Sequence, residues 1–180
     1  MAIRRPGYHR PRPAWQSGRA DPRGRRCEPV DYDIEGSDVG YRWFSRERLE
    51  PLFSFSFGLS YTLYELSDLD VEYGDTIKAS VQVANLGGRS GSLAVQCYVT
   101  KLGEGGFVRR LAGFAKVDLS AGQRRIATLE LEPRVFARYQ EKEGCFQIAE
   151  GVYRVWAAQH AEAEDTWKDI VVRSASRIAP

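Results

Sequence analysis

The segment Ile77–Gly88 reads Ile-Lys-Ala-Ser-Val-Gln-Val-Ala-Asn-Leu-Gly-Gly and sets the pattern of the C-terminal part of the chain. Every second residue from Ile77 to Val83 is apolar, and the residues between them are Lys, Ser and Gln. A period of two places successive side chains on opposite faces of a strand. The segment therefore predicts a strand with one buried and one polar face, closed by an Asn-Leu-Gly-Gly turn.

The same alternation recurs further along the chain. It is found at 93–99, 127–131 and 153–157, where Arg154 and Trp156 occupy the polar side, and strand-like stretches run over 107–119 and 170–172. Turn-forming residues lie at 103–106 and 120–122, and no segment shows a helical period. Seven or so short strands bounded by turns predict an all-β fold, an antiparallel β-sandwich.

Composition and charge divide the chain into two parts. The 180 residues are 43% hydrophobic and 12% aromatic, which is enough for a core. The net charge is +2, but residues 1–26 carry eight Arg and one Asp, or +7, which leaves −5 for the rest. Residues 1–30 have almost no aliphatic side chains to bury, so we expect a disordered basic tail. A solvated tail is favoured over nucleic-acid binding, because the tail shows no regular basic and aromatic alternation.

Cysteines and hydropathy bear on the class of protein and leave the redox compartment open. The chain has three cysteines, Cys27, Cys97 and Cys145, and this odd number argues against a complete disulfide framework. Their spacing is not that of metal ligands. Cys97 alternates with Val residues as a small buried hydrophobe would. No run of 18 apolar residues exists, so we expect no transmembrane helix and no membrane partner. Arg4 and Arg5 are not followed by the apolar run of an export signal, so we expect no signal peptide in the chain as written.

Two segments before the strands carry a specific resemblance. Residues 32–44 read Tyr-Asp-Ile-Glu-Gly-Ser-Asp-Val-Gly-Tyr-Arg-Trp-Phe, and residues 51–62 read Pro-Leu-Phe-Ser-Phe-Ser-Phe-Gly-Leu-Ser-Tyr-Thr. They resemble the signature that joins the sugar-binding α/β domain to the C-terminal fibronectin type III-like domain of family 3 glycoside hydrolases, the β-glucosidase group. Residues 81–87, 91–99, 111–117 and 150–153 are similar to strand motifs of that family. Ser54 and Ser56 depart from it, since Pro and Gly are usual there.

The resemblance implies a domain organisation and a function. Residues 66–175 would form an immunoglobulin/fibronectin type III-like antiparallel β-sandwich, preceded by an extended aromatic-rich linker over 31–65 from a missing catalytic domain. The parent enzyme would hydrolyse terminal β-glucosides with two carboxylates, in a periplasmic or secreted location. This chain would be its non-catalytic structural module. The alternative is an independent module that binds carbohydrate or a polyanion.

No residue can be nominated as catalytic. A glycosidase needs two carboxyl groups about 5 to 9.5 Å apart across the scissile bond. The Ser-Asp-Trp setting of the family's nucleophile is absent, and Ser67-Asp68-Leu69 is interpreted as a turn-forming Asp before a strand. Glu35 in the linker is interpreted as an ion-pair or hydrogen-bond partner, with Arg42 as a candidate. We expect nearby acidic residues to be solvated charges: Asp31, Asp33 and Asp38.

Metal and cofactor sites are not expected either. His9 and His160 are far apart and have no cysteine beside them, which disfavours zinc. Glu162, Glu164 and Asp165 lack the spacing of a calcium loop, so we interpret them as a solvated acidic loop. The sequence predicts no cofactor.

Aromatic residues are concentrated before the first strand. Eight of the chain's 21 aromatic residues lie between 41 and 64. Large aromatics dominate interface energetics, so we interpret this segment as packing against the catalytic domains of the parent hydrolase, and we weigh sugar stacking as the alternative. The candidate interface residues are Tyr41, Arg42, Trp43, Phe44, Phe53, Phe55, Phe57 and Tyr61.

Overall fold

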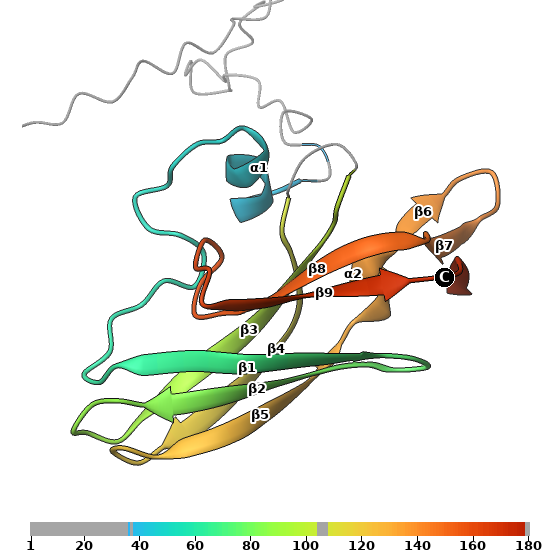
Figure 1. Cartoon of the computed structure of the whole chain (residues 1–180). Coiled ribbons are helices and arrows are strands. Elements are labelled where there is room, and N and C mark those ends of the chain that lie inside the picture. Colours follow the sequence, from blue (N-terminus) through green and yellow to red (C-terminus); the bar gives the residue numbers. More distant parts are fainter. Residues whose placement is uncertain (1–35, 37, 104–107, 179–180) are drawn as a thin grey trace, which may run out of the picture. The chain divides into compact units, whose positions relative to one another are not determined.

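The computed structural model describes residue 36, residues 38–103 and residues 108–178. This part of the chain is built mostly from short strands (Figure 1). The elements are α1 (Tyr41–Arg46), β1 (Tyr64–Tyr73), β2 (Ile77–Asn85), β3 (Gly91–Lys101), β4 (Arg110–Leu119), β5 (Arg124–Leu131), α2 (Pro133–Phe136), β6 (Arg138–Gln140), β7 (Cys145–Ile148), β8 (Gly151–Ala158), β9 (Thr166–Val172) and β10 (Ser176–Ile178). Neither described helix is long enough to cross a bilayer. The predicted all-β class is confirmed.

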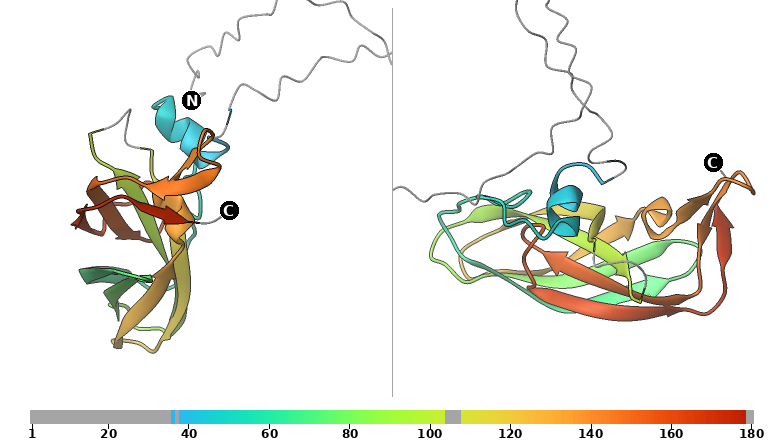
Figure 2. Two further views of the ribbon diagram at one scale, coloured as in Figure 1. Left: turned by 90° about the vertical axis from the view of Figure 1, so that its right-hand side faces the viewer. Right: turned by 90° about the horizontal axis from the view of Figure 1, so that it is seen from above.

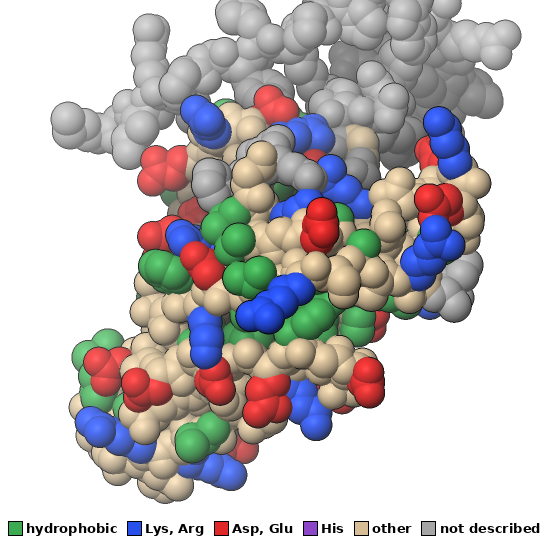
Figure 3. Space-filling view, turned by 45° about the vertical axis from the view of Figure 1, so that its right-hand side comes forward, with side chains coloured by type: hydrophobic (Ala, Val, Ile, Leu, Met, Phe, Trp, Pro, Cys, Tyr) green, Lys and Arg blue, Asp and Glu red, His purple; other side chains and the backbone are tan. Residues whose placement is uncertain are grey.

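Two antiparallel sheets face each other. One has the strand order β1-β2-β5 and the other β4-β3-β8-β9, and the two lie as layers in Figures 1 and 2. A small third sheet, β10-β7-β6, projects from one end of the sandwich. On the face shown in Figure 3, charged side chains lie between small groups of hydrophobic ones. The arrangement confirms the antiparallel β-sandwich.

The core lies between the two sheets and follows the alternation in the sequence. In β2 the residues Ile77, Ala79, Val81 and Val83 are all buried, and the polar residues between them are exposed or half-buried. Strand β2 pairs with β1 on one side and with β5 on the other, where Val81 lies opposite Ala127. A strand side chain stands perpendicular to its sheet, so the apolar half of each strand meets the facing sheet.

The turn after β2 is held by the buried side chain of Asn85. Its amide nitrogen donates to the carbonyls of Arg89 at 2.7 Å and Ser120 at 3.1 Å. Its oxygen accepts from the backbone N–H of Gly87 at 3.1 Å and from the hydroxyl of Thr62 at 2.5 Å. A buried amide is tolerated when its polar atoms find partners. Asn85 therefore ties the β2–β3 turn, the turn after β4 and the end of the linker together.

The expectation for Asp68 was wrong in its placement. Asp68 lies inside β1, not before it, and the pairing of β1 with β2 shifts between Ser67 and Asp70. Its φ is 52°, in the left-handed region that Asp tolerates better than most residues. An extra residue in one strand produces such a bulge and bends the strand.

The linker is not extended throughout. Residues Tyr41–Arg46 form the short helix α1, which begins after Gly40 at φ 66°. Asp38 was expected to be solvated, but its carboxylate accepts from Arg42 at 2.5 Å and from Arg46 at 3.1 Å. Side chains four residues apart share one helix face, which lets a single carboxylate bridge both arginines. Glu35, Asp31 and Asp33 lie outside the described residues, as does the tail.

Candidate functional site

The outer face of the four-stranded sheet is covered where the linker crosses it. Tyr98 of β3 and Trp156 of β8 form, with Ala158 and Ala161, a buried cluster separate from the main core. Trp156 was expected on the polar side of its strand, yet it is only 5% exposed. Beta strands 3 and 8 are therefore buried on both faces at this point. The facing sheet covers the inner face of these strands, and the linker covers their outer face.

Tyr41 fixes the first part of the linker to the sheet. Its ring stacks on Phe55 at a centroid distance of 5.1 Å and meets Tyr98 edge-on at 5.9 Å. Its hydroxyl accepts a hydrogen bond from the backbone N–H of Leu111 at 2.8 Å. Burial raises the pKa of Tyr98 above its ordinary value, and the neighbouring Tyr41 adds to the shift. Tyr98 is therefore a neutral, packed surface for Tyr41.

The loop after β8 fixes the second part of the linker. The hydroxyl of Ser54 and Nδ1 of His160 are hydrogen-bonded at 2.8 Å. The backbone N–H of Ala161 donates to the carbonyl of Phe55 at 3.1 Å. The ring of Phe57 lies edge-on to His160 at 5.6 Å. Residues 54–57 are thus attached to the sandwich through backbone and side chain alike.

Arg109 completes the cover of Trp156. Its guanidinium carbon lies 4.3 Å above the Trp156 ring, a cation–π geometry. It donates to the carbonyls of Ala161 and Ala163, at 3.1 and 2.6 Å, and to the carboxylate of Glu164 at 2.7 Å. Burial lowers the pKa of Arg109, and the charge of Glu164 opposes this shift. Arg109 was not among the predicted site residues, although an Arg just before a strand and a Trp on its polar side are the sequence signals for this pair.

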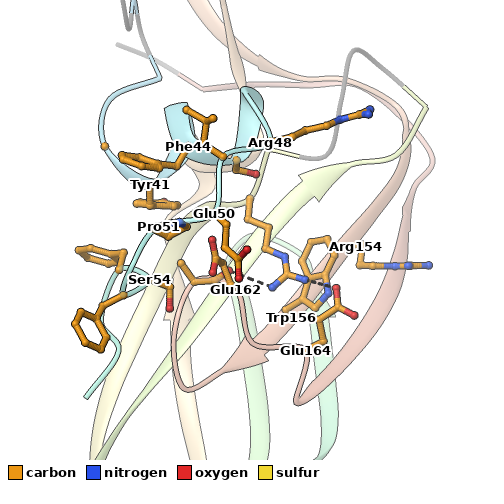
Figure 4. A pocket seen from close by; sticks show the side chains of 17 residues that line it. Tyr41, Phe44, Arg48, Glu50, Pro51, Ser54, Arg154, Trp156, Glu162 and Glu164 are labelled. Carbon is orange, nitrogen blue, oxygen red and sulfur yellow. Dashed lines mark hydrogen bonds and ion pairs between the residues drawn. The ribbon is translucent and has the colours of Figure 1, made fainter. Parts of the chain in front are cut away.

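A hollow of about 800 Å³ lies between the linker and this cluster. Figure 4 shows Tyr41 and Phe44 from α1 on one side and Trp156 with Arg154 on the other. Three carboxylates line it, from Glu50, Glu162 and Glu164. Glu164 is largely exposed, as expected of a solvated acidic loop, and it also pairs with Arg109.

The predicted interface residues lie on two sides of the linker. Those of α1 are half-buried: Tyr41, Arg42, Trp43 and Phe44. The others are exposed, from 44% for Phe57 to 91% for Tyr61, with Phe53 and Phe55 between them. We call Leu52, Phe53, Phe57, Leu59, Tyr61 and Leu63 the linker face, because all six are exposed apolar or aromatic side chains. The linker therefore contacts the sandwich at several points and leaves these six side chains exposed, although the ring of Phe57 also meets His160.

Nothing in the described part of the chain forms a cluster of three or more potential metal-binding groups. Cys97 is fully buried in the main core, and burial raises the pKa of its thiol to about 12. The thiolate is the form that binds metals and attacks electrophiles, so this cysteine serves packing. The chemistry that the site offers is apolar contact and hydrogen bonding.

The chain is similar to a known domain family and to known enzymes. Residues 94–161 match the family described as Fibronectin type III-like domain. Thermostable beta-glucosidase B of Acetivibrio thermocellus is 35% identical over 158 residues, which is 83% of this chain and 20% of that enzyme. A beta-glucosidase of Rhizobium radiobacter is 36% identical over 135 residues, 71% of this chain and 16% of the relative. The chain thus spans about a fifth of the length of these curated relatives.

Solved structures of β-glucosidases contain the same fold over most of this chain. The structure of beta-glucosidase 3B from Thermotoga neapolitana in complex with glucose superposes with a TM-score of 0.73 at 28% identity, over 82% of this chain and 21% of that one. DesR, a beta-glucosidase from Streptomyces venezuelae in complex with D-glucose, gives a TM-score of 0.71 at 29% identity, over 77% and 18%. The described fold therefore corresponds to about a fifth of each of these longer solved chains.

Proposed function

This chain is the fibronectin type III-like domain, with its preceding linker, of a family 3 glycoside hydrolase of the β-glucosidase type, and from this premise we propose that it braces the catalytic domains of the parent enzyme. It is a non-catalytic module. The parent's activity would be the hydrolysis of terminal β-glucosides. The observation that carries the proposal is the two-sided linker, attached to the sandwich at Tyr41 and Ser54 while its linker face is exposed.

The exposure of the linker face has a physical cost. Leu59 is 95% exposed and Tyr61 91% exposed, and four further apolar residues of the same short segment are exposed as well. Burial of apolar surface contributes about 25 cal/mol per Å², so a partner that covers these side chains gains affinity. Exposed groups of apolar side chains mark interaction sites in soluble proteins.

The anchoring of the linker matters for the strength of this docking. A flexible segment loses conformational entropy when it docks, which weakens binding. Here Tyr41 and the Ser54–His160 pair already fix the segment before a partner arrives. The linker face is therefore presented in a preorganised form, which suits a brace between domains.

A second candidate function is favoured by the rings of Phe53 and Phe57, which stack on each other at 5.5 Å and are both exposed. Aromatic rings of this kind can stack on sugars. The glucose complexes among the solved relatives are complexes of enzymes of which this chain covers about a fifth, so they do not decide where a sugar would lie. The domain interface remains the first proposal.

A chimera tests the proposal. The matched 158-residue segment of Acetivibrio thermocellus beta-glucosidase B is replaced by the corresponding part of this chain. We expect a soluble enzyme with one cooperative thermal transition, and a lower Tm when Phe53→Ser and Leu59→Ser are introduced. Phe114→Ser is the matched control, because Phe114 is a 72% exposed aromatic on β4, outside the linker face. Equal Tm values for the linker-face variant and the control would contradict the brace, and loss of glucose-polymer binding with unchanged Tm would favour the second candidate.

A further inference from the structure

A second cavity, of about 700 Å³, lies apart from the hollow under the linker. Its walls come from α1, the ends of β3 and β4, and the segment from α2 to β7. Of the described residues that line it, five are cations and one is a carboxylate, Asp38. The cations are Arg42, Arg46, Lys101, Arg110 and Arg138. Lys and Arg side chains also lie close together in the upper part of Figure 3. We call this space the basic cavity.

Arg110 is the central cation of the basic cavity. It is half-buried, and its side chain donates to a neutral group, the carbonyl of Ala137, at 3.1 Å. Burial lowers its pKa below the ordinary value, and the positive charges of Arg42 and Arg138 lower it further, while Asp38 offsets only part of the shift. A charge taken out of water is costly unless it is paired with an opposite charge. Among the described residues, the guanidinium of Arg110 is hydrogen-bonded to the carbonyl of Ala137 and is not paired with a carboxylate.

Arg42 supplies a free donor in the same wall. The carboxylate of Asp38 is shared between Arg42 and Arg46, and Arg46 also pairs with Glu47 at 3.2 Å. The Nε atom of Arg42 is buried and has no hydrogen-bond partner within the described residues. A buried donor without a partner is destabilising, and a bound acceptor would remove that cost.

The basic cavity also has apolar and aromatic walls. Val99, Phe136 and Tyr153 line it, and so do Tyr139 and Phe146, whose rings meet edge-on at 5.1 Å. Cavities of roughly 300 to 1,000 Å³ that combine apolar walls with a few convergent polar groups are typical of small-molecule sites. Guanidinium groups match the planar geometry of carboxylates and phosphates, to which they can donate two parallel hydrogen bonds.

We propose that the basic cavity binds a small oxyanion, either inorganic phosphate or the carboxylate of an acidic sugar, with Arg110 and Arg42 as the recognising side chains. The bound oxygen atoms would accept from the guanidinium of Arg110 and from Nε of Arg42. None of the side chains that carry this proposal belongs to the linker face. Arg110 lies outside the candidate interface residues, so its substitution tests this site without altering the linker face.

Isothermal titration calorimetry of the full chain at low salt tests the site, with inorganic phosphate, glucuronate and glucose as probes. We expect heat from phosphate or glucuronate and none from glucose. Arg110→Gln should weaken binding by about tenfold or more, the scale of one charge-assisted hydrogen bond. Arg125→Gln is the matched control, since Arg125 also donates to a backbone carbonyl, that of Asp118, but lies on β5. The control should leave the affinity unchanged.

The outcomes separate the sources of the anion. A response to phosphate alone assigns the site to phosphate groups, and a tighter response to glucuronate assigns it to an acidic sugar. If Arg110→Gln and Arg125→Gln weaken anion binding equally, scattered surface charges bind the probes and the proposal is overturned. The absence of heat from both anions also overturns it. Arg110→Lys keeps the charge but loses the planar fork. It should fall between the wild type and Arg110→Gln, with thermal melts confirming that each variant is folded.

Discussion

Truncation of Tyr41 measures how firmly the linker is held. Tyr41→Phe removes the hydroxyl that accepts from the backbone N–H of Leu111 at 2.8 Å, and leaves that part-buried donor unpaired. The expected cost is about 1 to 2 kcal/mol. Tyr41→Ala also removes a ring that stacks on Phe55 and meets Tyr98. Full truncation of a buried aromatic costs about 3 to 5 kcal/mol, and Tyr41 is half-buried, so we expect a total of about 2 to 4 kcal/mol.

The linker offers a matched control for this experiment. Tyr61 has the same side chain in the same linker but is 91% exposed. Tyr61→Ala should change the free energy of unfolding by about 0.5 kcal/mol or less, as surface substitutions usually do. Urea denaturation of the three variants measures the differences, with an unchanged m-value showing that the same surface is exposed on unfolding. Equal stabilities for Tyr41→Ala and Tyr61→Ala would refute the anchoring.

Five further results are expected. In the same denaturation assay, Val95→Ala should lower the free energy of unfolding by on the order of 1 to 4 kcal/mol because Val95 is fully buried in the core. Gly113→Ala should lower it by about 1 to 3 kcal/mol, because an added Cβ would lie 2.7 Å from the carbonyl oxygen of Glu130. Removal of residues 1–26 should leave it almost unchanged. In a Cys27→Ser background, a thiol reagent at pH 8 should modify the half-buried Cys145 quickly and Cys97 only on unfolding. The reason is that burial raises the pKa of Cys97 to about 12. Rapid loss of two thiols in the folded state would contradict this prediction. The hydrogen bond from Arg154 lowers the pKa of Asp169, so above about pH 4 the wild type should be more stable than Asp169→Asn, by less than about 1 kcal/mol for a largely exposed pair. This difference in stability should vanish as the pH falls through the lowered pKa. A difference that grows in acid would contradict the prediction.

The strands of the core were predictable because their signal is local. The alternation from Ile77 to Val83 places each residue on a face without knowledge of the partner strand, and the structure confirms it. The position of Cys97 in the core followed in the same way. The family resemblance came from two linker segments and four strand motifs, and the comparisons agree with it.

What the sequence did not predict depends on contacts between distant segments. Trp156 occupies the polar side of its strand and is buried only because the linker and Arg109 cover that side. The helix α1 spans six residues, too few for a helical period to show. The strands β6 and β10 have three residues each, so their alternation carries no signal. The division into tail, linker and sandwich at residues 30 and 65 stays a prediction.

The central proposal is that this chain braces its parent enzyme without carrying the catalytic residues, and hydrolysis of an aryl β-glucoside tests it most directly. The purified chain should release no product, because neither a nucleophile nor an acid can be assigned to it, whereas the chimera with the remainder of Acetivibrio thermocellus beta-glucosidase B should turn the substrate over. Turnover by the purified chain alone that Glu35→Gln abolishes would contradict the account.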